Sequence, residues 1–328
     1  MRSARLAVQS AVRTDLSDLP PDARVLVACS GGPDSMALLA AAVAVSAGRE
    51  VAAAIVDHGL QPDSAAVAQA AAAASRDVGA QPVEVLTVRV GTSGGPEAAA
   101  RRARYEALDT AAERLQVAAV LLGHTADDQA ETVLLGLLRG AGARALAGMP
   151  ARRGHYRRPL LELPREVVRS AYPDLPTWDD PHNRDPRFAR SRVRSRLLPL
   201  LEAELGPGVA MALARSAGQV GAEVAAVDAW ADKVWQRLGP PPEAPGVRLP
   251  VADLQELPEA VLVRLWVRAA VAAGARRDRL TTPHLRALTR LVTRWRGQGP
   301  VDLPGGVDAR RVSGTVVLRT RSTSAPEK

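Results

Sequence analysis

Residues 29–35 of the chain read Cys-Ser-Gly-Gly-Pro-Asp-Ser, and they stand between an apolar run and a helical pattern. The apolar run, residues 25–28, predicts a buried strand, and residues 36–47 predict a helix. A helix entered from a glycine turn leaves its first backbone N–H groups unpaired and its positive dipole end exposed. The order strand, glycine turn, helix therefore predicts an α/β fold with an anion site at the start of the helix.

The turn contains the candidate ligands for the phosphates of a nucleotide: Ser30, Gly31, Gly32, Pro33, Asp34 and Ser35. The two glycines let the backbone approach phosphate oxygens closely, and the two hydroxyls add donors. The chain has neither the Walker pattern G-x-x-x-x-G-K-[ST] nor G-x-G-x-x-G at this place. A purely structural explanation also exists, because Pro33 suits a first helical position and Asp34 complements the helix dipole.

Strand patterns alternate with helical patterns through the first 125 residues, with strands expected at 25–28, 51–56, 83–90 and 117–122. This alternation predicts a doubly wound, mostly parallel sheet, in which ligands bind beyond the carboxyl ends of the strands. Three polar stretches fall at such ends: residues 29–35, the Asp57-His58-Gly59-Leu60 stretch, and residues 123–132.

The second half of the chain has a different pattern. Helical segments are expected at about 209–238, 251–274 and 281–296, and turns at 304–306 and 313–314 predict a small antiparallel sheet at the end. The stretch Gly206-Pro207-Gly208 predicts the domain boundary. We therefore expect a first domain at 1–207, which contains the candidate anion site, and a mainly helical domain at 208–328.

The net charge of +8 comes almost wholly from arginine, since lysine occurs only at Lys233 and Lys328. Arginine suits phosphate, so RNA is the expected partner, although an arginine-rich genome would give similar numbers. The single cysteine, Cys29, excludes a disulfide framework and a zinc site built on paired cysteines. Because no long apolar run and no signal-peptide pattern is present, we expect a cytoplasmic protein without a membrane segment.

The stretch at residues 123–132 reads GHTADDQAET. If a helix starts near Thr125, then His124, Asp128 and Glu131 lie about one turn apart on one side, which suggests a site. Thr125 and Asp128 also form a capping box, which explains Asp128 without any chemistry. Capping does not explain His124 and Glu131 together.

Two arginine patterns complete the candidates. Arg101 and Arg104 recur at helical spacing after Glu97, although Glu97 and Arg101 could be an ordinary ion pair of an exposed face. After the segment 178–183 (Trp-Asp-Asp-Pro-His-Asn), six arginines fall within residues 184–196 and only Asp185 opposes them. That density predicts a phosphate-binding element.

These stretches together resemble the tRNA(Ile)-lysidine synthetase family of the PP-loop ATP pyrophosphatase superfamily. Its motifs are matched by SGGPDS at 30–35, VDHGL at 56–60, E-x-x-A-R-x-x-R-Y at 97–105 and GHTADDQAET at 123–132, within a likeness that spans roughly residues 20–205. The chain departs from the family at Gln61, where arginine is common, at 180–183, where D-x-S-N is usual, and at 190–194, where R-N-x-x-R is usual.

The resemblance implies a two-step reaction on the wobble cytidine of an isoleucine tRNA with a CAU anticodon, in which ATP and Mg²⁺ adenylate the base and lysine then displaces AMP. It implies these roles: for catalysis, Asp34, His124, Asp128 and Glu131; for ATP, residues 30–35 with Asp57 and His58; for lysine, His124, Asp128 and Glu131; for tRNA phosphates, Arg101, Arg104, Arg190 and Arg194; for the metal, Asp34 and Asp127. Either Asp128 or His124 is the expected base for lysine.

The sequence also has to be compared with other functions that use a similar loop. A tRNA 2-thiocytidine enzyme uses a similar loop but needs paired cysteines, which this chain lacks. Other PP-loop adenylating enzymes, which act on small molecules, share S-G-G-x-D-S but not GHTADDQAET. A non-catalytic RNA-binding protein on this scaffold would not need Asp34, Asp128 and Glu131 intact. The sequence makes no prediction of oligomeric state.

Overall fold

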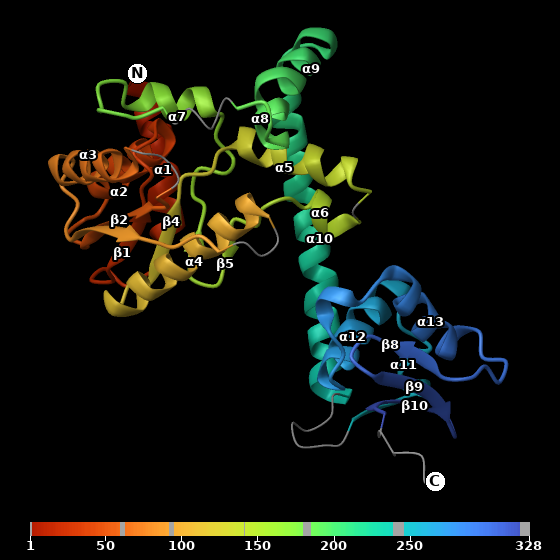
Figure 1. Cartoon of the computed structure of the whole chain (residues 1–328). Coiled ribbons are helices and arrows are strands. Elements are labelled where there is room, and N and C mark those ends of the chain that lie inside the picture. The colour runs from red at the N-terminus through yellow and green to blue at the C-terminus, as the bar shows by residue number, and fades with distance from the viewer. Residues whose placement is uncertain are drawn as a thin grey trace. The chain divides into compact units, whose positions relative to one another are not determined.

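The computed structural model describes residues 2–59, 63–91, 95–140, 142–179, 185–238 and 246–321, without the side chains of Pro96 and Glu97. The chain forms two compact units, residues 1–221 and 222–328 (Figure 1). The strands of the first unit are β1 (Val25–Ala28), β2 (Val51–Asp57), β3 (Val83–Thr87), β4 (Ala119–Leu122), β5 (Arg152–Arg153) and β6 (Tyr156–Arg157). Its helices are α1 (Arg2–Leu16), α2 (Pro33–Ala44), α3 (Ser64–Asp77), α4 (Pro96–Arg114), α5 (Ala126–Leu138), α6 (Ala143–Leu146), α7 (Arg165–Ala171), α8 (Ala189–Arg192), a π-helical turn η2 (Val193–Leu197), α9 (Leu198–Leu205) and the first part of α10 (Val209–Leu238).

The six strands form one sheet in the order β3-β2-β1-β4-β6-β5, in which only β5 runs antiparallel to its neighbour. This confirms the doubly wound, mostly parallel sheet. The chain proceeds from β1 outward to β3 and then returns to place β4 on the other side of β1. The carboxyl ends of β1 and β4 are therefore adjacent at the point where the strand order reverses, which is where such sheets bind ligands.

The apolar run of β1 is continuous because both faces of the strand are covered. Val25 and Val27 pack into one core with α1, α2, α3 and α7, whereas Leu26 and Ala28 pack into a second core with α4. Burial of each such valine or leucine side chain contributes about 1.5–3 kcal/mol. The two cores hold β1 rigidly, so the turn that follows it has a fixed position.

Local differences from the expected elements have simple causes. Helix α2 begins at Pro33, three residues earlier than expected, because proline is accepted at a first helical position. The hairpin of β5 and β6 lies in the basic stretch 152–158 and was not expected, since two-residue strands carry no readable alternation.

The second unit contains a four-stranded antiparallel sheet in the order β7-β10-β9-β8, which confirms the small terminal sheet. Its elements are β7 (Val247–Pro250), α11 (Val251–Leu254), α12 (Glu259–Ala272), the 3₁₀ turn η3 (Arg277–Arg279), α13 (Thr282–Thr293), β8 (Val301–Leu303), β9 (Val307–Val312) and β10 (Thr315–Thr320). The fully buried Trp266 lies in its core. The compact units divide within α10, and the functional boundary at 207/208 stays a prediction.

No single helix of the described ranges is both long and apolar enough to cross a membrane. One pair, Ala189–Leu205 with Val209–Leu238, meets the criteria of length and composition only when two segments bent by 101° are taken together.

Gly31 is expected to tolerate no side chain. Its φ is +78°, and a Cβ there would lie 2.9 Å from the Cβ of Ala71 in α3. Gly48 has a similar φ of +92° but open space around it, so Gly48→Ala measures the conformational strain alone, about 1–2 kcal/mol. Gly31→Ala should lower the free energy of unfolding by about 1–3 kcal/mol more than that in urea titrations. A second substitution, Ala71→Gly, should recover part of the difference; equal losses in the two alanine variants would contradict the clash.

Candidate functional site

A pocket of about 270 Å³ lies where β1 and β4 end. It is lined by the glycine turn, by α4, by the start of α5, by α7 and by segments around residues 178 and 190. The polar and charged lining residues are Ser30, Asp34, Ser35, Arg104, His124, Asp128, Arg169, Trp178, Asp179, Arg190 and Arg194. The structure therefore brings together the predicted motifs at residues 29–35 and 123–132.

The glycine turn is closed on itself by its two serines. Ser35 Oγ donates to the carbonyl of Gly32 at 2.9 Å and accepts from the backbone N–H of Ser30 at 3.1 Å. Helix α2 starts after Gly32 with no side-chain cap. Among the described residues the first N–H groups of α2 therefore have no side-chain cap, and an anion in the pocket can take that place.

Two other segments of the chain lie close to the backbone of this turn. The N–H of Trp178 donates to the carbonyl of Gly31 at 2.9 Å. A Cβ on Gly123, just after β4, would lie 3.1 Å from both the carbonyl oxygen of Asp34 and the Cα of Ser35. Glycine at 123 thus lets the loop that carries His124 lie directly against the start of α2.

The start of α5 confirms the capping box. The N–H of Thr125 donates to Asp128 Oδ2 at 2.9 Å, and the Thr125 hydroxyl reaches the same oxygen at 3.0 Å. Glu131 has no part in the cap, yet its side chain is 0% exposed. A buried carboxylate needs cations or hydrogen bonds to remain charged.

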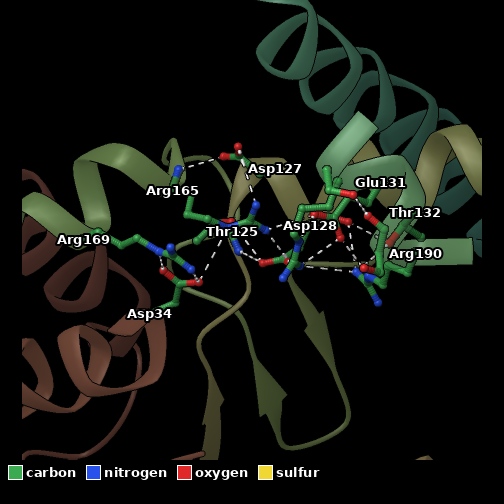
Figure 2. Close-up of polar contacts among 12 residues, drawn as sticks. Asp34, Thr125, Asp127, Asp128, Glu131, Thr132, Arg165, Arg169 and Arg190 are labelled. Atoms are coloured by element: carbon green, nitrogen blue, oxygen red, sulfur yellow. Dashed lines mark hydrogen bonds and ion pairs between the residues drawn. The ribbon is translucent and has the colours of Figure 1, made fainter. Parts of the chain in front are cut away.

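Three arginines from distant segments supply those partners, and two of them, Arg165 and Arg190, are labelled in Figure 2. Arg165 Nη2 lies 3.0 Å from Asp128 Oδ1 and 3.1 Å from Glu131 Oε1. Arg194 lies 2.9 Å from Asp128 and 2.7 Å from Glu131, and Arg190 Nε lies 2.9 Å from Glu131 Oε2. This arginine–carboxylate cluster (Asp128, Glu131, Arg165, Arg190, Arg194) has three cations and two anions, so it carries one net positive charge when all five are ionised.

The cluster holds Asp128 ionised. Burial by itself would raise the pKa of this carboxyl, but Arg165, the Thr125 N–H and the other two arginines lower it to about 2. A carboxylate with so low a pKa, and with both oxygens already accepting hydrogen bonds, is a weak proton acceptor.

His124 is neutral at pH 7. Burial is the main cause that lowers its pKa to about 3, Asp128 opposes that shift, and Arg104, Arg158 and Arg190 add to it. Its Nδ1 is buried and has no hydrogen-bond partner within the described part of the chain. His124 thus keeps a nitrogen that is not committed to another group.

Asp34 is a pocket carboxylate that could hold a magnesium ion. Mg²⁺ binds through one or two carboxylates together with substrate phosphates, so it does not need a full protein cage. Such a cage, of three or more His, Cys, Asp or Glu side chains, does not occur among the described residues. Asp34 lines the pocket, whereas Asp127 Oδ2 accepts the backbone N–H of Arg165 at 2.7 Å and does not line it.

The remaining predicted residues divide between the pocket and its surroundings. Arg104 lines the pocket. Arg101 is exposed on α4, where its guanidinium lies 5.1 Å from the ring centre of Tyr105. Asp57 is buried and accepts a backbone N–H two residues later at 2.9 Å. His58 is half-buried, and burial followed by the charge of Arg104 lowers its pKa. Neither Asp57 nor His58 is in the pocket lining.

Sequence reasoning missed Arg165 and Arg169, both on α7. The signal was two arginines four residues apart directly after Pro164, which places them on one face of a short helix. Residues 180–184 and Gln61, where the family pattern is not followed, lie outside the described residues, as does the Glu97 side chain.

A parallel sheet with an uncapped glycine turn after its first strand, and acidic and basic side chains around that turn, defines a PP-loop nucleotide-binding domain. A family model described as PP-loop domain matches residues 6–201, and one described as TilS substrate binding domain matches residues 249–317. Relatives that are about half identical to this chain over nearly its whole length are named tRNA(Ile)-lysidine synthase. The chain belongs to the tRNA(Ile)-lysidine synthase family, as its motifs predicted.

A tRNA(Ile)-lysidine synthase of Thermobifida fusca is 52% identical over 315 residues, covering 95% of this chain and 96% of that protein. One from Streptomyces coelicolor is 51% identical over 314 residues, covering 92% of this chain and 86% of that protein. Among solved structures, the U34-tRNA thiolase NcsA from Methanococcus maripaludis with its [4Fe-4S] cluster aligns with a TM-score of 0.56 at 18% identity, covering 67% of this chain and 80% of that one. The last likeness shows the fold alone.

The Asp128 cap makes a testable contribution to stability at low pH. Because the pKa of Asp128 in the folded chain lies below its ordinary value of 3.8, its ionised form stabilises the fold above about pH 4, and this contribution is lost as the pH falls toward 2. Between about pH 5 and pH 2.5 the unfolding free energy of wild type should fall by about 1–2 kcal/mol more than that of Asp128→Asn. Urea titrations at each pH measure this. Asp77→Asn, at an exposed carboxylate, should follow wild type; parallel curves for Asp128→Asn and wild type would refute it.

Proposed function

We propose that the chain uses ATP to join lysine to C2 of the wobble cytidine in an isoleucine tRNA with a CAU anticodon, giving lysidine. The observation that carries this proposal is a single pocket in which an uncapped helix start adjoins a buried acidic and basic cluster, in a chain of this family. The first feature serves phosphate transfer, and the second serves an amine.

In the first step the C2 oxygen of the cytidine attacks the α-phosphorus of ATP. A new P–O bond forms, the bond to the bridging oxygen breaks, and pyrophosphate leaves with that electron pair. The N–H groups at the start of α2 hold phosphate oxygens, and Arg104 brings a positive charge to the same pocket. Asp34 would hold Mg²⁺, which when bound neutralises charge on the departing phosphates.

In the second step a neutral amine of lysine attacks C2, the C2–O bond breaks, and AMP leaves. Only about one side-chain amine in 2,500 is neutral at pH 7, so the site has to accept a proton from lysine. His124 is a better acceptor than Asp128, since its Nδ1 is uncommitted and both Asp128 oxygens are occupied. Anionic phosphates beside Arg104 and Arg190 would offset the cations that help to lower the pKa of His124.

Lysine itself would bind at His124, Asp128 and Glu131. Its ammonium group has to compete there with three guanidinium groups. Phosphates of the tRNA would favour lysine binding by attracting Arg190 and Arg194, which are 29% and 28% exposed and line the pocket.

The remaining parts of the proposal concern the partner. The net charge of +8 and the TilS substrate binding domain at 249–317 support tRNA contacts by the region 208–328, and residues 1–207 would carry the chemistry. We place the reaction in the cytoplasm.

The direct experiment mixes the chain with ATP, Mg²⁺, lysine and a transcript of the isoleucine tRNA with a CAU anticodon. The anticodon fragment should gain the mass of one lysine less one water, and pyrophosphate should be released only when the tRNA is present. A methionine tRNA with the same anticodon and other amino acids serve as controls. Pyrophosphate exchange without RNA would instead indicate a small-molecule adenylating enzyme, and RNA binding without pyrophosphate release would indicate a binding protein.

His124→Asn should separate the two steps. Pyrophosphate release should persist, the second step should slow by about a hundredfold or more, and adenylated tRNA should accumulate in single-turnover reactions. Raising the pH should recover part of the second step, because more lysine is then neutral without a proton acceptor. An equal loss of both steps, or an unchanged second step, would remove His124 from this role.

A further inference from the structure

Arg169 stands apart from the other arginines of the pocket because its partner is Asp34. Its Nε lies 3.0 Å from Asp34 Oδ1 and its Nη2 3.4 Å from Oδ2, so it grips both oxygens of the carboxylate (Figure 2). Arg165 Nε lies 3.6 Å from Asp34 Oδ2. The carboxylate that would receive Mg²⁺ is therefore already neutralised by the protein's own cations.

The two kinds of ion pair in the pocket differ in how easily they exchange partners. The Arg169 side chain is 46% exposed and that of Asp34 19%, so water screens this ion pair more than it screens the pairs of Glu131, and the pair contributes less to stability. Glu131 is 0% exposed and Arg165 only 13%, so separating them would leave buried charges unpaired. Asp34 can therefore release Arg169 more easily than Glu131 can release Arg165.

Helix α7 does not need Arg169 to hold its place. Val168 and Ala171 are fully buried in the core that α7 shares with α1 and α2. Arg165 ties the start of the helix to Asp127 and to the cluster. A fixed structural role for the Arg169–Asp34 pair would thus duplicate contacts that already anchor α7.

Arg169 lines the same pocket as the glycine turn. Once a metal ion takes Asp34, phosphates bound at the start of α2 would share this pocket with the Arg169 guanidinium. Guanidinium matches phosphate oxygens with two parallel hydrogen bonds. AMP contains only the inner phosphate of ATP, whereas pyrophosphate corresponds to the two outer ones. Binding measurements with these two ligands therefore distinguish contacts to the inner phosphate from contacts to the outer phosphates.

We propose that Arg169 is an exchangeable counterion, which neutralises Asp34 in the nucleotide-free protein and moves to the outer phosphates of ATP, the future pyrophosphate, when nucleotide and metal bind. It thereby positions the leaving group and keeps Asp34 ready for the metal. This inference rests on the proposed function, because it takes Asp34 as the metal carboxylate.

The test measures binding of inorganic pyrophosphate and of AMP to the full chain by isothermal titration calorimetry. Arg169→Met should weaken magnesium pyrophosphate binding by about tenfold to a hundredfold and change AMP binding by less than about twofold. Arg169→Lys should recover part of the loss. Arg153→Met, which removes an exposed arginine from β5 and changes the net charge equally, should behave as wild type.

A double-mutant cycle in metal-free buffer distinguishes exchange from a static pair. Asp34→Asn should tighten pyrophosphate binding, because Arg169 is freed and a negative charge is removed. Adding Arg169→Met to Asp34→Asn should then weaken pyrophosphate binding again by about tenfold.

If Arg169 served only Asp34, the second substitution would have no effect in that background, and the inference would be wrong. Equal weakening of AMP and pyrophosphate by Arg169→Met would also overturn it. Wild-type protein that bound neither ligand with Mg²⁺ would instead refute the proposed function.

Discussion

The site depends on one buried electrostatic requirement, the neutralisation of Glu131. Its carboxylate is fully removed from water on α5, and the cations that balance it come from α7, α8 and the π-helical turn η2. Breaking such a buried pair by removing one partner costs about 3–5 kcal/mol, so these segments have to converge for the fold to be stable. Their convergence builds one wall of the pocket. The same arginines lower the pKa of Asp128 against the effect of burial, whereas burial is the main cause of the lowered pKa of His124.

The glycine turn forms another part of the pocket lining. The two cores on either side of β1 hold the strand, and the serines close the turn so that the start of α2 lacks a side-chain cap. Phosphate recognition by main-chain N–H groups needs no mobile side chain, whereas proton transfer and charge exchange do. The pocket thus combines a rigid anion site with ion pairs whose side chains differ in exposure to solvent. They range from the buried Glu131 to the half-exposed Arg169.

Much of this could be foreseen from local patterns. The apolar run before Gly31, and the alternation of strand and helix after it, predicted the sheet and the edge where ligands bind. GHTADDQAET predicted a helix start with His124, Asp128 and Glu131 close together, and the motifs together predicted the family. What local pattern could not distinguish was a carboxylate that caps a helix from one that does chemistry, because Asp128 does the first in either case.

The sequence by itself determined the order of the elements, the glycine turn and the family, since each depends on residues within one turn or strand of one another. Only the tertiary structure decided that Arg190 and Arg194 face Glu131, that Arg165 joins them across 34 residues, and that Arg169 holds Asp34 across 135. Ion pairs between distant segments produce no periodic pattern in the sequence. Their partners depend on which side chains face the same cavity once the core has packed. They also depend on the high free energy of a buried charge that lacks a partner.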